Sequence, residues 1–131
     1  MPSIFSKIIS GEIPSYKIAE NDDYIAFLDI FPLKKGHTLI VPKKEIDYIF
    51  DLDDATLSGL LIFSKEVAHA IQKAIPCNRV GMSVIGLEVP HAHVHLIPIN
   101  TTHDMNFSNP KLSLSKEEFE KIALSIKKGL V

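Results

Sequence analysis

The stretch Pro90-His91-Ala92-His93-Val94-His95-Leu96-Ile97-Pro98 alternates histidine with apolar residues. Such alternation is typical of a β-strand, because successive side chains of a strand point to opposite faces. We expect a strand over residues 92–97 that presents His91, His93 and His95 on one face, with successive members of the row about 6.5–7 Å apart at Cα. The apolar residues between them would bury against a helix and hold the imidazoles in place. The bracketing prolines would limit the pairing of this strand.

Size and composition indicate an ordinary globular chain. It has 131 residues, of which 46% are hydrophobic and 23% are charged, and its formal net charge is −2. These values predict a single domain over residues 1–131. The near-neutral charge argues against a surface that tracks nucleic-acid phosphates, so we expect no nucleic-acid partner.

Cysteine content and hydropathy point to a setting inside the cell. The single cysteine, Cys77, excludes an internal disulfide. No apolar run approaches the roughly 20 residues that a membrane span needs, and no leader peptide stands out. We therefore expect a soluble, cytoplasmic protein that does not bind membranes.

Residue patterns predict helices and strands in mixed order. Apolar residues at three- and four-residue spacing indicate helices, and runs of β-branched and aromatic residues indicate strands. The expected helices span residues 4–9, 57–75 and 116–128, and the expected strands span residues 24–28, 37–41, 80–85 and 92–97. Ser3 is suited to cap the first helix, and Ser115 with Glu118 forms a capping box for the last. The order predicts an α+β domain with an antiparallel sheet.

Three imidazoles in a row are suited to nucleophilic chemistry. Neutral imidazole is a nucleophile near pH 7, so the central His93 would attack while its neighbours donate hydrogen bonds to phosphoryl oxygens. A pH-sensing cluster and a metal site are the alternatives. The outer two Cα atoms of a straight row lie about 13 Å apart. A metal would therefore use one or two of these histidines and a ligand from elsewhere.

The motif PHAHVHLIP resembles the His-x-His-x-His signature of the histidine triad (HIT) family, in which x is apolar. Two further blocks, IFSKIISGEIPS (residues 4–15) and DDYIAFLDIFPLKKGHTLIVPKKE (residues 22–45), resemble the amino-terminal half of its Hint-like nucleotide-binding branch. The resemblance covers about residues 3–98. It implies a five-stranded antiparallel sheet with helices packed on it, and a homodimer. It also implies an enzyme that acts on nucleoside monophosphate derivatives such as adenosine phosphoramidates.

The resemblance also implies roles for the histidines. His93 matches the nucleophile, which would attack the α-phosphorus and form a nucleotidyl-histidine that water hydrolyses. His95 matches the residue that contacts the phosphate near the leaving group, and His91 matches the member that supports the network. His37 matches an upstream histidine beside the active site.

On the nucleoside side, Asp29 matches the carboxylate that accepts from the ribose hydroxyls, a role suited to an ionised acceptor. Four apolar residues match the walls around the base, although simple core packing explains the same pattern. These residues are Phe5, Ile8, Phe27 and Ile30. The segment from Asn100 onward matches less and yields no candidate site residue.

The chain departs from the family pattern at the positions that bind zinc in many relatives. There the family has two cysteines and a histidine, and this chain has Ser3, Ser6 and Glu45. His91 alone would not hold a metal. We therefore expect no structural zinc and no other cofactor.

A second departure precedes the triad. Gly86 fits the phosphate-binding pattern of the family, whereas Glu88 stands where serine or glutamine is usual. A carboxylate beside a phosphate is repulsive unless a positive charge lies between them. Glu88 would therefore contact a positively charged leaving group, hold a triad imidazole, or turn away.

Three functions are compatible with these residues. The leading hypothesis is a nucleotide phosphoramidase or related nucleotidyl hydrolase. The first alternative is a non-catalytic purine nucleotide-binding or interaction module that uses the histidine row to hold a phosphate. The second alternative is a metalloenzyme with histidine ligands.

Overall fold

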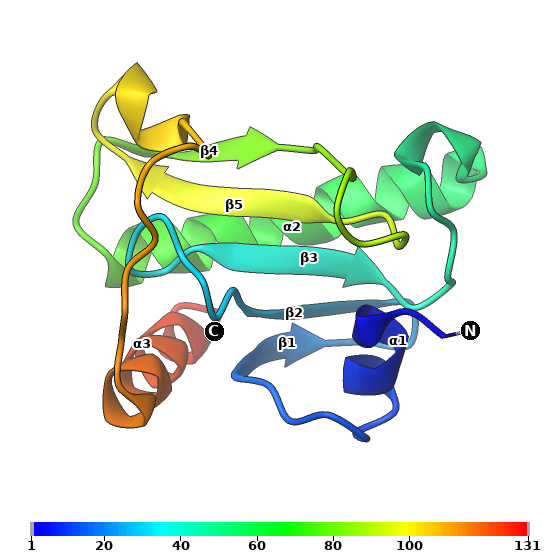
Figure 1. Ribbon diagram of the computed structural model, residues 1–131, viewed down its shortest axis with the longest axis horizontal. Helices are drawn as coiled ribbons and strands as arrows, with labels where there is room; N and C mark the ends of the chain where they lie inside the picture. Colours follow the sequence, from blue (N-terminus) through cyan, green and yellow to red (C-terminus); the bar gives the residue numbers. More distant parts are fainter. Residues whose placement is uncertain (1, 131) are drawn as a thin grey trace.

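The protein folds around a five-stranded antiparallel sheet in strand order β1-β2-β3-β5-β4. The computed structural model describes residues 2–130. The strands are β1 (Lys17–Glu20), β2 (Tyr24–Leu28), β3 (Thr38–Pro42), β4 (Arg79–Ser83) and β5 (Val94–Ile99). Figure 1 shows β1 and β4 at the two edges of the sheet. The predicted α+β fold with a five-stranded antiparallel sheet is confirmed.

Helices cover the two faces of the sheet unequally. The α-helices are α1 (Ile4–Ile9), α2 (Asp54–Ala74) and α3 (Lys116–Lys128), and two short 3-10 helices span Ile49–Asp51 and Thr102–Met105. The long helices α2 and α3 lie behind the sheet in Figure 1, whereas the short α1 lies on its front side. Within residues 2–130, the front face is therefore covered by no long helix. None of the helices in residues 2–130 is long and apolar enough to cross a membrane.

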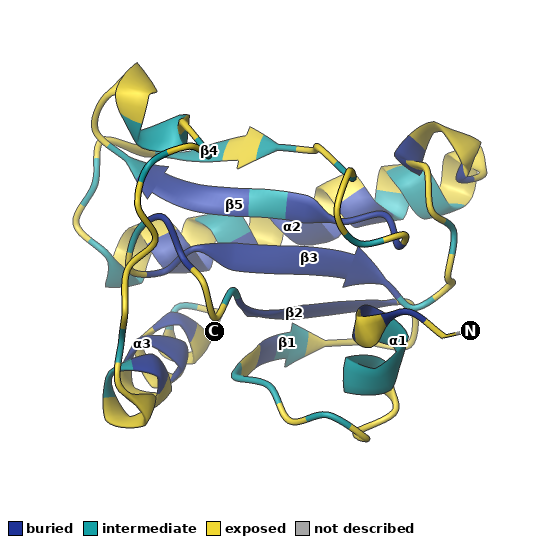
Figure 2. Ribbon diagram, in the orientation of Figure 1, coloured by how far each residue is buried: buried dark blue, intermediate teal, exposed yellow. Residues whose placement is uncertain are grey.

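Alternation along the central strands produces a core on each face. On β2, Ala26 and Leu28 join the large core under α2 and α3, while Ile25 and Phe27 join a smaller core under α1. Figure 2 shows that β2 and β3 are buried along their length, in contrast to the partly exposed β4. Burial on both faces fixes the register of these strands, because a slip by one residue would exchange the two faces.

The histidine strand starts later than the sequence pattern predicts. The expected strand over residues 92–97 is observed from Val94, so His91 and His93 precede it, outside the strand ladder. Pairing with β3 begins at Val94, and the backbone carbonyl of Pro42 at the end of β3 accepts instead from the ring of His91. A side-chain hydrogen bond therefore satisfies the Pro42 carbonyl, which lies beyond the last backbone hydrogen bond of the β3–β5 pairing.

The predicted division of the two faces nevertheless holds. Ala92, Val94 and Leu96 are buried in the large core beneath the helices. The strand continues through Pro98, which the sequence reading placed at its end. Proline has no backbone N–H to donate. Pro98 is tolerated because β3 pairs only with residues 94–96 of β5 and makes no hydrogen bond at position 98.

Candidate active site

A cleft of about 490 Å³ opens on the front face of the sheet. It is bounded by α1, by the ends of β2 and β3, by the segment 85–89 and by part of the chain beyond β5. Nearly all of the predicted site residues line it: Phe5, Ile8, Phe27, Asp29, Ile30, His37, Gly86, Glu88, His93 and His95. His91 is the exception, because its ring is buried behind the cleft. The row of three histidines therefore divides, with two members lining the cleft and one supporting them.

Strand register brings the polar residues together. Leu39 lies opposite Phe27 on β2 and opposite His95 on β5. Asp29 follows Phe27 by two residues, and His37 precedes Leu39 by two residues. Side chains two residues apart along a strand point to the same face, so Asp29, His37 and His95 lie on one face of the sheet. The backbone N–H of Asp29 donates to the carbonyl of His37 at 2.9 Å, which extends the β2–β3 pairing by one further bond. The predicted grouping of Asp29, His37 and His95 thus follows from pairing alone.

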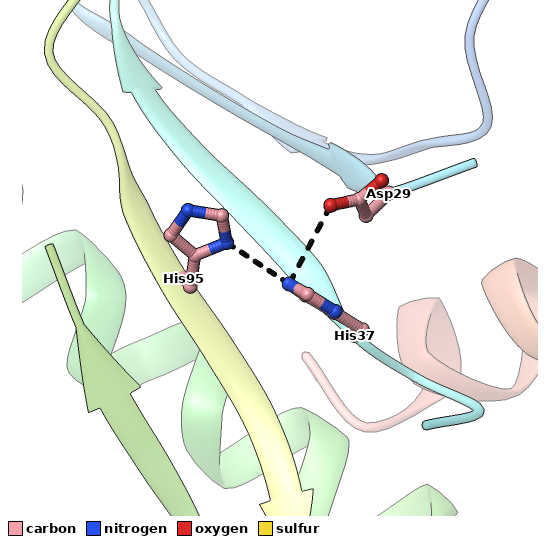
Figure 3. A group of neighbouring side chains, drawn as sticks. All are labelled: Asp29, His37 and His95. Carbon is pink, nitrogen blue, oxygen red and sulfur yellow. Dashed lines mark hydrogen bonds and ion pairs between the residues drawn. The ribbon is translucent and has the colours of Figure 1, made fainter. Parts of the chain in front are cut away.

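Hydrogen bonds fix the tautomers of His37 and His95. The backbone N–H of Leu33 donates to Nδ1 of His37 at 3.0 Å, so the proton of the neutral His37 ring is on Nε2. This Nε2 lies 3.0 Å from Nδ1 of His95 and donates to it (Figure 3). Nδ1 of His95 is therefore an acceptor, and Nε2 of His95 carries the proton. His95 presents an N–H donor to the cleft.

His93 has the opposite tautomer. Its Nδ1 lies 2.7 Å from the carbonyl oxygen of His91, which can only accept. The proton of the neutral ring is therefore on Nδ1, and Nε2 has a free lone pair. The ring of Phe5 packs edge-on against His93 at a centroid separation of 4.9 Å and limits its rotation. Adjacent imidazoles on one wall thus offer a nucleophilic nitrogen and a hydrogen-bond donor.

Burial keeps this group of imidazoles uncharged at neutral pH. Desolvation, reinforced by His95, lowers the pKa of His37 to about 3. Desolvation, reinforced by His93, lowers the pKa of His95 to about 4. The pKa of His93 is also lowered, chiefly by burial. The donor and acceptor roles described above therefore apply throughout the neutral range.

Two carboxylates and one ammonium group provide the charges around the cleft. Asp29 accepts a hydrogen bond from the backbone N–H of Phe31 at 2.8 Å. Burial raises the pKa of Asp29, while the nearby Lys111 opposes that rise and Glu88 adds to it. Glu88 is exposed but lines the cleft, so it does not turn away from it, and its charge acts to raise the pKa of His93. Contact with a positively charged leaving group and contact with a triad imidazole remain the two alternatives for Glu88.

One group of side chains has the spacing of a metal site. One ligand atom each from Asp29, His37 and His95 falls within 4.8 Å of the others. Their hydrogen bonds account for this closeness, because Nε2 of His37 donates to His95 and lies 3.5 Å from a carboxylate oxygen of Asp29. A divalent ion bound there would have to displace the Nε2 proton of His37.

The positions where many relatives bind zinc have a different chemistry here. Ser3 and Ser6 supply hydroxyl oxygens, and these hydroxyls are hydrogen-bonded to His91 and to Glu45. Structural zinc is held by thiolate sulfur and imidazole nitrogen, so this donor set does not suit it.

Among the cleft residues that sequence reasoning missed, Phe107 and Lys111 follow β5 and contribute an aromatic ring and a charge. The ring of Phe107 packs edge-on against His95 at a centroid separation of 4.9 Å. The Lys111 ammonium donates to the backbone carbonyls of Phe107 and Asn109. Within residues 2–130, Lys111 is the one lysine or arginine that lines the cleft. Neither residue belongs to a periodic pattern, so only the observed path of the chain identifies them.

Comparisons with known proteins agree with this architecture. A family model described as "HIT domain" matches residues 10–102. A HIT-like protein of Borreliella burgdorferi is 35% identical over 131 residues, which is 94% of each chain. An adenosine 5′-monophosphoramidase of Schizosaccharomyces pombe is 33% identical over 128 residues, which is 96% of each chain. The crystal structure of a HIT-like protein from Bartonella henselae superposes with a TM-score of 0.83 at 32% identity, over 97% of this chain and 95% of the other.

Replacement of Lys111 by methionine should weaken the binding of AMP. The pKa values of the cleft imidazoles of His37, His93 and His95 are lowered, so Lys111 is the cleft side chain with a positive charge to offset that of the phosphate. We expect Lys111→Met to raise the Kd for AMP about threefold, because a solvent-screened charge pair contributes about 0.2–1 kcal/mol. Isothermal titration calorimetry measures this change. Lys65→Met, which removes an exposed lysine of α2 on the far face, is the matched control. Equal Kd values for the two variants would contradict this role.

Proposed function

The chain belongs to the HIT domain family, and we propose that it hydrolyses nucleoside monophosphate derivatives, adenosine phosphoramidates among them. The observation that carries the proposal is the tautomer of His93. Because Nδ1 donates to the carbonyl of His91, Nε2 is an unprotonated nucleophile on a residue that lines the cleft. The adenosine 5′-monophosphoramidase of Schizosaccharomyces pombe, a relative over nearly the whole chain, supports this choice of substrate class.

We propose that the nucleoside occupies the end of the cleft beside α1. Apolar side chains there suit a purine base, and Phe5 and Phe27 form its most buried part, with ring centroids 5.6 Å apart. Asp29 also lines the cleft, with a carboxylate oxygen 3.5 Å from Nε2 of His37, and would accept hydrogen bonds from the ribose hydroxyls. A nucleotide bound in this way directs its phosphate toward His93 and His95.

In the proposed reaction, Nε2 of His93 attacks the phosphorus. A nitrogen–phosphorus bond forms to His93 and the bond to the leaving nitrogen breaks, so that the amine departs with the electron pair and takes a proton from solvent. Nε2–H of His95 donates a hydrogen bond to a phosphoryl oxygen and stabilises its charge in the transition state. Water then attacks the phosphorus, returns a proton to solvent and releases His93. Each of these roles is filled by an imidazole, so we propose that the reaction uses no metal cofactor.

Glu88 bears on the choice of leaving group. Its side chain lines the cleft, and its charge acts on His93, which in the proposed reaction attacks the phosphorus as the amine departs. A carboxylate at this point favours a leaving group that is positively charged and disfavours one that is negatively charged. We propose that amines with a positive charge are the preferred leaving groups.

The proposed activity is tested with an adenosine phosphoramidate, by following release of AMP and amine. We expect His93→Ala to lower kcat by at least about a thousandfold, because no other cleft group has a free nucleophilic nitrogen fixed by a hydrogen bond. His69→Ala, which removes an exposed histidine of α2, should leave the rate unchanged. Equal rates in wild type and His93→Ala would refute the proposal. Binding of AMP without turnover by the wild type would instead favour a binding module. Stoichiometric metal whose removal abolishes turnover would favour a metalloenzyme.

We propose that two copies of the chain associate through β4. This strand is an edge of the sheet, and its unpaired backbone groups are available to a partner. Met82 pairs with the buried Leu96 and faces the same side, yet its side chain is 55% exposed. An apolar strip that the chain's own helices leave uncovered suits a subunit interface.

Light scattering on the purified protein tests the association. We expect a mass of two chains for the wild type and of one chain for Met82→Glu, because a buried unpaired carboxylate would disfavour the interface. Leu124→Glu is the matched control, since Leu124 on α3 is also 55% exposed and lies away from β4. A monomeric wild type, or a dimeric Met82→Glu protein, would contradict association through this edge.

A further inference from the structure

Four side chains at the amino-terminal end of α1 form a hydrogen-bonded group, which we call the amino-terminal clamp: Ser3, Ser6, Glu45 and His91. One carboxylate oxygen of Glu45 accepts from the backbone N–H of Ser3 and from the hydroxyl of Ser6, both at 2.6 Å. The hydroxyl of Ser3 lies 2.7 Å from Nδ1 of His91. These contacts join three segments that are far apart in the sequence.

Both ring nitrogens of His91 are hydrogen-bonded. Nε2 of His91 donates to the carbonyl of Pro42 at 2.7 Å, so in the neutral ring Nδ1 accepts from the hydroxyl of Ser3. The ring is 0% exposed, and its centroid lies 5.9 Å from that of Phe5. A ring fixed at both nitrogens and enclosed by protein also fixes its own backbone.

That backbone determines the tautomer of the nucleophile. The carbonyl of His91 accepts from Nδ1 of His93 at 2.7 Å, and this bond leaves the lone pair on Nε2. The carbonyl lies before β5, outside the strand ladder. The backbone N–H of Ala92 belongs to the same peptide unit and holds it on one side by donating to the carbonyl of Ile46 at 2.7 Å. The side chain of His91, hydrogen-bonded to Ser3 and to Pro42, is the second restraint on this carbonyl.

Glu45 is the charged member of the clamp and lies outside the cleft. Hydrogen bonds from Ser3 and Ser6 lower its pKa to about 2, so its acceptor oxygen is ionised throughout the neutral range. Its nearest oxygen is 4.0 Å from Nδ1 of His91, beyond direct hydrogen-bond distance. The hydrogen-bonded path from Glu45 to His91 therefore runs through Ser3, alongside a direct electrostatic interaction across 4.0 Å.

We propose that Glu45 is a positioning residue for catalysis, which orients Ser3 and thereby fixes His91 and the reactive tautomer of His93. The inference rests on the proposed role of His93 as nucleophile. At the positions where many relatives bind zinc, the hydrogen bonds and the carboxylate charge of the clamp hold α1 against the start of the triad.

The test compares Glu45→Ala with Glu45→Gln, which retains an acceptor oxygen at the same place. Asp47→Ala, a substitution of an exposed carboxylate in the same segment, is the control. The readouts are kcat and KM for an adenosine phosphoramidate, the Kd for AMP, the melting temperature, and the side-chain ¹⁵N chemical shifts of His93. Those shifts report the tautomer directly and require no turnover.

We expect Glu45→Ala to lower kcat about tenfold with a change in the Kd for AMP below threefold, because the cleft lining is retained. The ¹⁵N shifts of His93 should change from a single Nδ1–H tautomer to a mixture. Glu45→Gln and Asp47→Ala should retain the wild-type tautomer and a kcat within about threefold. If Glu45→Ala does not fold, Ser6→Ala removes one of the two bonds to Glu45 and should shift the same readouts in the same direction.

A lower melting temperature for Glu45→Ala with unchanged kcat and unchanged His93 shifts would overturn the proposal, because Glu45 would then only stabilise the fold. Equal loss of kcat in Glu45→Ala and Glu45→Gln would also overturn it. A tautomer change in Glu45→Ala with no turnover by the wild type would support the clamp and refute the proposed function.

Discussion

Each imidazole of the cleft is confined to one tautomer, and the rest of the site depends on this restriction. A neutral imidazole has a proton on one ring nitrogen and a lone pair on the other. The hydrogen-bond partner of one nitrogen therefore decides whether the other nitrogen has the proton or the lone pair. The N–H of Leu33 makes Nδ1 of His37 an acceptor, and the carbonyl of His91 makes Nδ1 of His93 a donor. Backbone atoms held by the fold thus determine that His93 presents a lone pair and that His95 presents a proton.

Desolvation makes these assignments hold at neutral pH. The lowered pKa values of His37 and His95 follow from burial by neighbouring side chains, including Phe107 beyond the last strand. Both ends of the chain therefore shape the cleft. The segment before β1 provides α1 with Ser3 and Ser6 of the amino-terminal clamp, and the segment after β5 provides Phe107 and Lys111. The central sheet holds these contributions in a fixed relation.

The sequence alone predicted the features that local rules decide. The capping box of Ser115 and Glu118 located α3 over residues 116–128, and alternation predicted which residues beside the histidines are buried. The residue patterns missed β1, which came only from the family resemblance. Its four residues are too few and too polar for a periodic signal. Long-range contacts set the rest: pairing with β3 decided where β5 begins, and chain path brought Lys111 to the cleft.

The pH dependence of kcat/KM tests the neutral nucleophile most directly. Protonation of Nε2 of His93 removes its lone pair, so the rate must fall as pH drops through the pKa of His93 in the free enzyme. Burial lowers that pKa below the ordinary histidine value of about 6.5. We predict that kcat/KM for an adenosine phosphoramidate declines as the pH is lowered, with a midpoint below pH 6.5. A midpoint at or above pH 6.5, or a rate that rises toward pH 5, would contradict the account.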